Sequence, residues 1–219
     1  MKQIYTLILF AATVLFAACD EHRDFPDTSM KPCHVLLTDG NVMSPAEYDN
    51  SDKEDKAIAV VFYVNQREDI EGEGYAIYLW DMAPLAFADS IGVEQGTSAD
   101  ITAWDGNANT FALYDTKETA SPMAEGVFDL WRYGQSAYVP SVAQMRLLYS
   151  MKETINPMIE KCGGNPLPNN PDDCWYWTST EVKGQQTAKA WLYSVGSGAM
   201  QETPKWQAHK VRPIITLNK

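Results

Sequence analysis

The apolar run at the N-terminus limits which residues of this chain can form its folded body. Lys2 is followed by an apolar stretch from Ile4 to Ala18 that only one tyrosine and two threonines interrupt. A helix that crosses a membrane needs roughly 20 apolar residues, whereas this run is shorter and stops at a charged segment beginning at Asp20. A short apolar core behind a positive charge is typical of a secretory signal peptide, which is removed. We therefore expect the folded body to be built from the residues that follow.

The end of the apolar run resembles a lipobox, the motif at which a lipoprotein signal peptidase cuts before a lipid-modified cysteine. Two alanines precede Cys19, although Phe16 departs from the usual small aliphatic residue. The resemblance implies a signal peptide at 1–18, a lipid anchor on Cys19, and a charged tether at 19–32 that lifts the domain off the membrane. The alternative is an ordinary secretory peptide that happens to contain a cysteine.

Acidic residues directly after Cys19 indicate where such an anchor would lie. Asp20, Glu21 and Asp24 follow it closely. An aspartate here resembles an inner-membrane retention signal in some Gram-negative bacteria. In Bacteroidetes-type lipoproteins, a short acidic stretch resembles the signal for export to the outer face of the outer membrane. We favour the second interpretation, which predicts an outer-membrane lipoprotein that faces the cell exterior.

The charge of the chain argues against nucleic-acid partners. The formal net charge is −12, and loss of 1–18 removes one lysine and no acid, so it becomes −13. Sequence-neutral nucleic-acid binding draws its affinity from Lys and Arg that neutralise phosphates, and no basic stripe is present. The roughly 200 residues that remain are enough to bury one large core. We expect a single domain at 33–219.

The order of the predicted elements indicates an α+β fold with mixed or antiparallel strands. Alternation and β-branched runs predict strands at 34–37, 57–64, 75–80, 175–180, 188–195 and 209–217, of which the second and third are expected to pair. The middle of the chain predicts two helices instead. Strands at both ends with helices between them differ from the regular alternation of a parallel doubly wound sheet.

The two helices are predicted from their N-terminal signals. Ser121 and Pro122 form an N-cap and a first-turn proline. Ser141 and Gln144 form a capping box ahead of a mostly apolar helix face. We expect that second helix to end near Asn156, with a further turn at 158–162 closed by two glycines.

A series of motifs across the chain carries a family resemblance. They are Tyr138-Val139-Pro140-Ser141, Tyr176 to Glu181, Ala190-Trp191, Lys210 to Pro213, and the earlier segments 62–65 and 105–110. In this order they resemble bacterial lipoprotein families of unknown function whose C-terminal region is C-type-lectin-like and distantly similar to sulfatase-modifying factors. The resemblance covers most of the mature chain and implies that Trp177, Trp191 and Arg212 are structural instead of catalytic.

No catalytic, metal or cofactor site is signalled. The three histidines are scattered, without the spacing of a zinc pair. Sulfatase-modifying enzymes use reactive cysteines, but Cys162 and Cys174 do not lie in a recognisable version of that segment. Asn170-Pro171-Asp172 faintly resembles the calcium site of sugar-binding C-type lectins, although the Trp-Asn-Asp partner is missing. We predict no catalytic residue, no metal and no cofactor.

Three cysteines remain after Cys19 in a protein that is expected to be exported. A disulfide is possible between Cys162 and Cys174, because the Gly-, Pro- and Asn-rich loop between them is short and easily closed. Cys33 is then the odd thiol. The alternative is that all three are reduced and buried as small apolar residues.

Aromatic residues in the last third of the chain supply the candidate ligand-binding positions. Neighbouring strand residues point to opposite faces, so if Trp177 is a core residue then Trp175 is expected in the core as well, with Tyr176 facing away. We select Trp175, Tyr193 and Trp206, with Asp172, as possible ligand-binding residues, since exposed rings suit stacking on sugars or anchoring a protein. The alternative is a tryptophan-rich core with no defined aromatic site.

These observations favour a non-enzymatic, adhesin-like surface module that binds a glycan or a protein. The second hypothesis is a hydrolase or modifying enzyme that acts on surface polysaccharide, which would need a cleft with two facing acids or an acid beside a nucleophile. A third is a hypervariable display protein.

Overall fold

The computed structural model describes residues 29–52, 56–67, 70, 72–130 and 137–218. The predicted signal peptide, Cys19 and the first part of the tether lie outside the described residues. The described part is α+β, with two sheets and four helices, which confirms the predicted class. No helix within these ranges is long and apolar enough to cross a membrane.

The first sheet has six strands in the order β2-β1-β3-β4-β11-β6, and all its pairings are antiparallel. Its strands are β1 (Val35–Leu37), β2 (Val42–Met43), β3 (Ala57–Val64), β4 (Gly74–Tyr78), β6 (Ala137–Tyr138) and β11 (Ile214–Leu217). The predicted strand at 57–64 has the bounds of β3, and its predicted pairing with the next strand is confirmed by β4.

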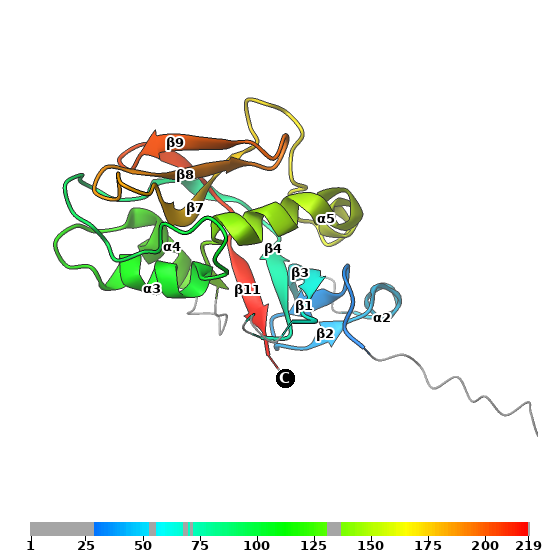
Figure 1. Cartoon of the computed structure of the whole chain (residues 1–219). Coiled ribbons are helices and arrows are strands. Elements are labelled where there is room, and N and C mark those ends of the chain that lie inside the picture. The colour runs from blue at the N-terminus through cyan, green and yellow to red at the C-terminus, as the bar shows by residue number, and fades with distance from the viewer. Residues whose placement is uncertain (1–28, 53–55, 68–69, 71, 131–136, 219) are drawn as a thin grey trace, which may run out of the picture.

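The second sheet has five strands in the order β5-β10-β7-β8-β9, in which only β10 and β7 run parallel. Its strands are β5 (Met82–Ala86), β7 (Trp175–Glu181), β8 (Lys189–Ser194), β9 (Met200–Pro204) and β10 (Ala208–Val211). The strand predicted at 209–217 is divided, because Arg212 and Pro213 carry the chain from this sheet into β11 of the first (Figure 1).

The helices are α2 (Pro45–Asp49), α3 (Gly106–Asp115), α4 (Pro122–Asp129) and α5 (Val142–Lys161). The two predicted helices are confirmed by α4 and α5, and the Ser141–Gln144 capping box is present. The prediction of only two helices is wrong, because α2 and α3 were not recognised. The start of α3 looks like a turn in sequence, but Gly106 lies so close to Gln144 that a Cβ there would be 2.3 Å from its Oε1.

Helix α5 continues through Pro157, so the predicted end near Asn156 is wrong. A proline costs a helix one hydrogen bond and some strain. Three apolar residues around it, Ile155, Met158 and Ile159, are buried against the first sheet and hold the helix together. The helix ends at Lys161 with Cys162 as its C-cap, followed by Gly163 with a positive φ of 73°.

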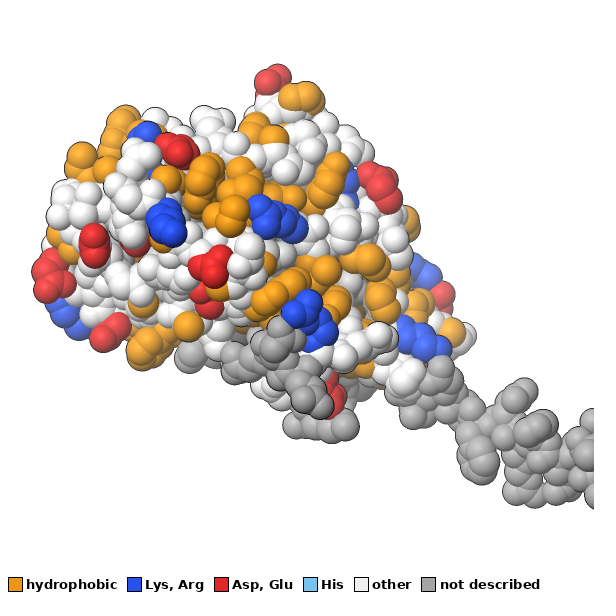
Figure 2. Space-filling view, in the orientation of Figure 1, with side chains coloured by type: hydrophobic (Ala, Val, Ile, Leu, Met, Phe, Trp, Pro, Cys, Tyr) orange, Lys and Arg blue, Asp and Glu red, His pale blue; other side chains and the backbone are white. Residues whose placement is uncertain are grey.

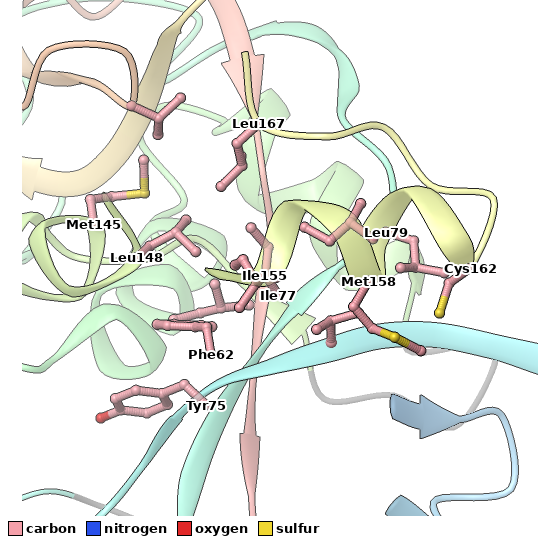
Figure 3. Close-up of a cluster of buried hydrophobic side chains, with 14 of the residues drawn as sticks. Phe62, Tyr75, Ile77, Leu79, Met145, Leu148, Ile155, Met158, Cys162 and Leu167 are labelled. Atoms are coloured by element: carbon pink, nitrogen blue, oxygen red, sulfur yellow. The ribbon is translucent and has the colours of Figure 1, made fainter. Parts of the chain in front are cut away.

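Apolar side chains form two core clusters on opposite sides of the sheets. The first joins α5 to β3 and β4, with side chains from α5 directed at Phe62, Ile77 and Leu79 (Figure 3). The second joins α3 and α4 to Phe87, Trp177 and the opposite faces of the strands. Figure 1 shows α5 on one side of the strands and the pair α3 and α4 on the other side.

Strand β7 contributes to both clusters. Trp177 is buried in the second cluster, where its indole nitrogen donates to the carbonyl of Leu85 at 3.0 Å. Tyr176 points to the other side, as alternation predicts, but there it is buried in the first cluster. The strand therefore has no open face, and only Trp175 at its start is partly exposed.

Candidate functional site

A cavity of about 240 Å³ opens over the second sheet, beside the start of β7. Its lining comes from the turn before β7 and from the five strands of this sheet: Pro84, Asp172, Asp173, Trp175, Leu192, Gln201, Ala208, His209 and Lys210. The hairpin registers explain part of this grouping, since Leu192 lies opposite both Trp177 and Gln201. The cavity combines one large ring with acidic, basic, amide and imidazole groups.

Trp175 is the aromatic wall of this cavity. Its side chain is half-buried and packs against both core clusters, so its position is supported from behind. The same ring also lines a smaller cavity of about 100 Å³ that reaches Asn169, Cys174 and Ser197. A supported, partly exposed indole offers a flat apolar surface at little cost in conformational entropy.

Lys210 organises the charged side of the cavity. Its Nζ forms an ion pair with Asp173 and lies 3.6 Å from a carboxylate oxygen of Asp81. The same amine stands 5.9 Å from the centre of the Tyr176 ring. Asp172 is exposed next to this pair, and its backbone N–H donates to the Asn170 side chain in a local turn. The cavity therefore has one carboxylate paired with a lysine and a second carboxylate facing solvent.

His209 lies on the cavity wall with its ring edge against Trp177, at 5.3 Å between ring centres. Burial lowers the pKa of this imidazole below its ordinary value, because the charged form loses hydration. Its Nε2 is 3.3 Å from the Gln207 side-chain oxygen. At neutral pH the ring is uncharged, so it can donate one hydrogen bond and accept one.

The four predicted ligand-binding residues are divided by the fold. Asp172 and Trp175 line the same cavity. Trp206 is 59% exposed in the turn between β9 and β10, and it is not part of that lining. Tyr193 is buried in the first core cluster on the opposite sheet face, with its ring edge against Tyr149. Tyr193 is therefore a core residue, and its selection as an exposed ring was wrong.

Sequence reasoning missed Gln201, His209 and Lys210. Lys210 belongs to a motif that was quoted only for its resemblance, and Gln201 lies in a strand that was not predicted. The sequence offered one signal for the charged side of this cavity, which is that Asp173 directly follows the selected Asp172. Their convergence depends on the pairing of β10 with β7 and of β8 with β9, which no local pattern specifies.

The expected disulfide between Cys162 and Cys174 is not formed, and all three described cysteines carry thiols. Cys162 is at the end of α5, packed with Leu79 and Met158 in the first cluster (Figure 3). The Cys174 sulfur lies 3.1 Å from the Ser194 hydroxyl, so it is directed toward β8. The two thiols do not form a disulfide because each of them packs against different residues. The alternative of buried thiols describes Cys162 and Cys174, whereas Cys33 is half-buried.

Polar residues of the Thr178–Glu181 segment point inward and join secondary-structure elements. The Thr178 hydroxyl donates to the carbonyl of Trp191, and the Thr180 hydroxyl accepts from the N–H of Val142 at the start of α5. The Ser179 N–H donates to the carbonyl of Pro140. These contacts give the motif a structural role, as expected for the neighbouring Trp177 and for Arg212.

The acidic charge of the chain does not gather into one patch on the face shown in Figure 2, where red side chains are spread among basic and apolar ones. Within the described ranges, no three His, Cys, Asp or Glu side chains are grouped so that they could hold a metal ion. Asp172 and Asp173 are sequence neighbours, and one of them is paired with Lys210. This differs from the two facing acids that the hydrolase hypothesis requires.

No protein-family model matches the chain, and no curated protein matches its sequence.

Proposed function

We propose that this chain is a surface-anchored lipoprotein whose C-type-lectin-like domain binds a saccharide without chemical turnover. The observation that carries the proposal is the half-buried ring of Trp175 beside Asp172, Gln201 and Lys210 in one cavity. A sugar ring presents an apolar face edged by hydroxyl groups. An indole suits the apolar face, and a set of polar side chains suits the hydroxyl groups.

Charge in the cavity favours a neutral saccharide over a charged one. Lys210 is engaged with Asp173, and His209 is uncharged at neutral pH because burial lowers its pKa. The exposed Asp172 would repel an anionic sugar and accept hydrogen bonds from hydroxyl groups. A cavity of about 240 Å³ has room for one sugar ring, with the rest of a chain extending into solvent.

The lectin-like assignment rests on the family resemblance and on compatible features of the α+β body. Strands at both ends of the domain enclose the helices in sequence, and the hallmark residues Trp177 and Arg212 are buried. Anchoring at Cys19 would place such a domain where extracellular glycans occur.

The test is a glycan array probed with the chain from Asp20 onward, followed by calorimetry with any saccharide that binds. We expect saturable binding that Trp175→Ala weakens by at least tenfold. Trp206→Ala is the matched control, since it removes a more exposed indole outside the cavity and should leave affinity unchanged. An array blank for the native chain, or equal loss in both variants, would contradict the proposed site. Unmodified Cys19 in membrane fractions would contradict the anchor.

A further inference from the structure

A closed polar cluster lies apart from the cavity, where Lys205, Glu181 and Gln95 meet. The three side chains come from the turn after β9, the end of β7 and the segment before α3. Their exposed fractions are 0%, 1% and 2%. Lys205 Nζ forms an ion pair with Glu181 Oε1 and donates to Gln95 Oε1 at 3.2 Å. One amine is therefore held against both a carboxylate and a side-chain amide.

The backbone around the amine is tightly held. The N–H of Lys205 donates to the carbonyl of Ala188 at 3.0 Å, and its carbonyl accepts from the N–H of Ala88 at 3.1 Å. The centre of the Phe87 ring lies 5.1 Å from Nζ. Because this ring is fully buried, the amine is covered by apolar surface and separated from bulk water.

Among the described residues, only the oxygen of the Gln95 side-chain amide has a hydrogen-bond partner. Its carbonyl oxygen accepts from Lys205, while its Nε2 is buried with no hydrogen-bond partner among the described residues. A buried amide N–H that lacks a partner costs free energy, and such groups are rare in folded proteins. The unpartnered nitrogen is the atom that an acyl transfer from Gln95 would release.

The surroundings of the amine suit the same chemistry. Burial lowers the pKa of Lys205, since desolvation penalises the ammonium, and the Glu181 carboxylate in contact with it is placed to accept a proton. A deprotonated lysine is a nucleophile, and a neighbouring base activates it. Fixed reactants in a dry site reach effective molarities of about 10⁵–10⁸ M in well-oriented intramolecular reactions.

We propose that Lys205 and Gln95 form an intramolecular amide cross-link, with Glu181 as the proton carrier. The amine of Lys205 adds to Cδ of Gln95 and forms a C–N bond. Glu181 takes the proton from Nζ and passes it to Nε2 of Gln95. The Cδ–Nε2 bond then breaks, and ammonia leaves with its electron pair. Nothing is oxidised or reduced, and no co-reactant is needed.

The product relieves the defect in the cluster. Loss of ammonia removes the unpartnered Nε2, and the new amide N–H remains beside the Glu181 oxygen that can accept from it. The bond would join the segment before α3 to the β9–β10 turn across 110 residues. The proposal concerns assembly of the domain and does not depend on saccharide binding.

Mass spectrometry of the full chain tests this directly. The protein is denatured, reduced and digested with trypsin, which cannot cut after Lys205 once its amine is acylated. We expect peptide 68–117 joined to peptide 190–210, with their summed mass lowered by that of one ammonia molecule. Separate peptides at unmodified mass, with cleavage between Lys205 and Trp206, would overturn the proposal. A joined pair that has lost water instead would overturn the assignment to Gln95.

Two variants separate the roles of the residues. Glu181→Gln retains the shape of the cluster but removes the proton carrier, so the two peptides should be recovered separately. Lys205→Arg keeps a positive charge but is a poor nucleophile, so it should likewise give no joined peptide. Full cross-linking in Glu181→Gln would overturn the role of Glu181. The native chain alone decides the cross-link if either variant fails to fold.

Discussion

Arg212 and Asp81 form an ion pair of 2.6 Å at the point where the chain passes twice between the two sheets. Arg212 is fully buried, and its guanidinium also donates to the carbonyls of Tyr78, Leu79 and Asn165. Arg212 lies in the connection between β10 and β11, and it thus binds the connection between β4 and β5. The Tyr176 hydroxyl donates to the second oxygen of Asp81 at 3.1 Å. Arg212 therefore joins both connections between the sheets to the segment after α5.

Replacing Arg212 by methionine should destabilise the domain strongly. The change removes the closer of two counter-charges from a largely buried carboxylate, which among the described residues keeps only Lys210 at 3.6 Å, and it takes the donor from several carbonyls. Removal of one partner of a buried pair costs about 3–5 kcal/mol. Urea unfolding measures the loss. The control is Lys189→Met, which removes an exposed pair with Glu202 and should cost less than about 1 kcal/mol. Equal effects of the two changes would contradict a special role for Arg212.

Trp177 and Trp206 should differ sharply in their contribution to stability. Trp177 is fully buried and bonded to Leu85, so Trp177→Ala should lower the free energy of unfolding by about 3–5 kcal/mol. Trp206 is exposed, and Trp206→Ala should stay within about 0.5 kcal/mol of the native chain. Chemical denaturation followed by circular dichroism tests both. A large loss at Trp206 would mean that this ring has a structural contact.

The thiols should be countable by alkylation. Protein recovered from an oxidising compartment, denatured without reductant, should take up an alkylating reagent at Cys33, Cys162 and Cys174. In the native state all three should react slowly, since two are buried and burial raises the pKa of Cys33. If Cys162 and Cys174 are protected from alkylation until a reductant is added, the predicted disulfide between them is present after all.

His209 should make stability depend on pH in the mildly acidic range. Because burial lowers its folded-state pKa below 6.5, the unfolded chain binds more protons just below that pH. The free energy of unfolding should therefore fall as the pH drops through 6.5 toward the folded-state value. His209→Gln lacks this proton, so its stability should vary less between pH 7.5 and pH 5.5. Identical pH dependence in the two proteins, measured by urea unfolding, would show that the ring is not desolvated.

Local sequence signals identified most of the regular elements. The apolar β-branched run of β3, the proline and serine at the start of α4 and the capping box of α5 all act through nearby residues, and all three were correctly predicted. Elements that lack such signals were missed. The clearest case is α3, whose glycine start is required by the approach of Gln144 from another helix.

The sequence by itself determined the α+β class and the main strands, because hydrophobic period and capping chemistry operate over a few residues. The structural character of Trp177 and Arg212 was implied by the family resemblance and not by these local patterns. Tertiary structure alone decided which aromatic rings are accessible. Strand alternation separates the faces of β7 but cannot tell that α5 covers one face and that α3, with α4 in the same cluster, covers the other. The cavity at Trp175 and the contact of Lys205 with Gln95 likewise arise from segments far apart in sequence, and only long-range packing brings them together.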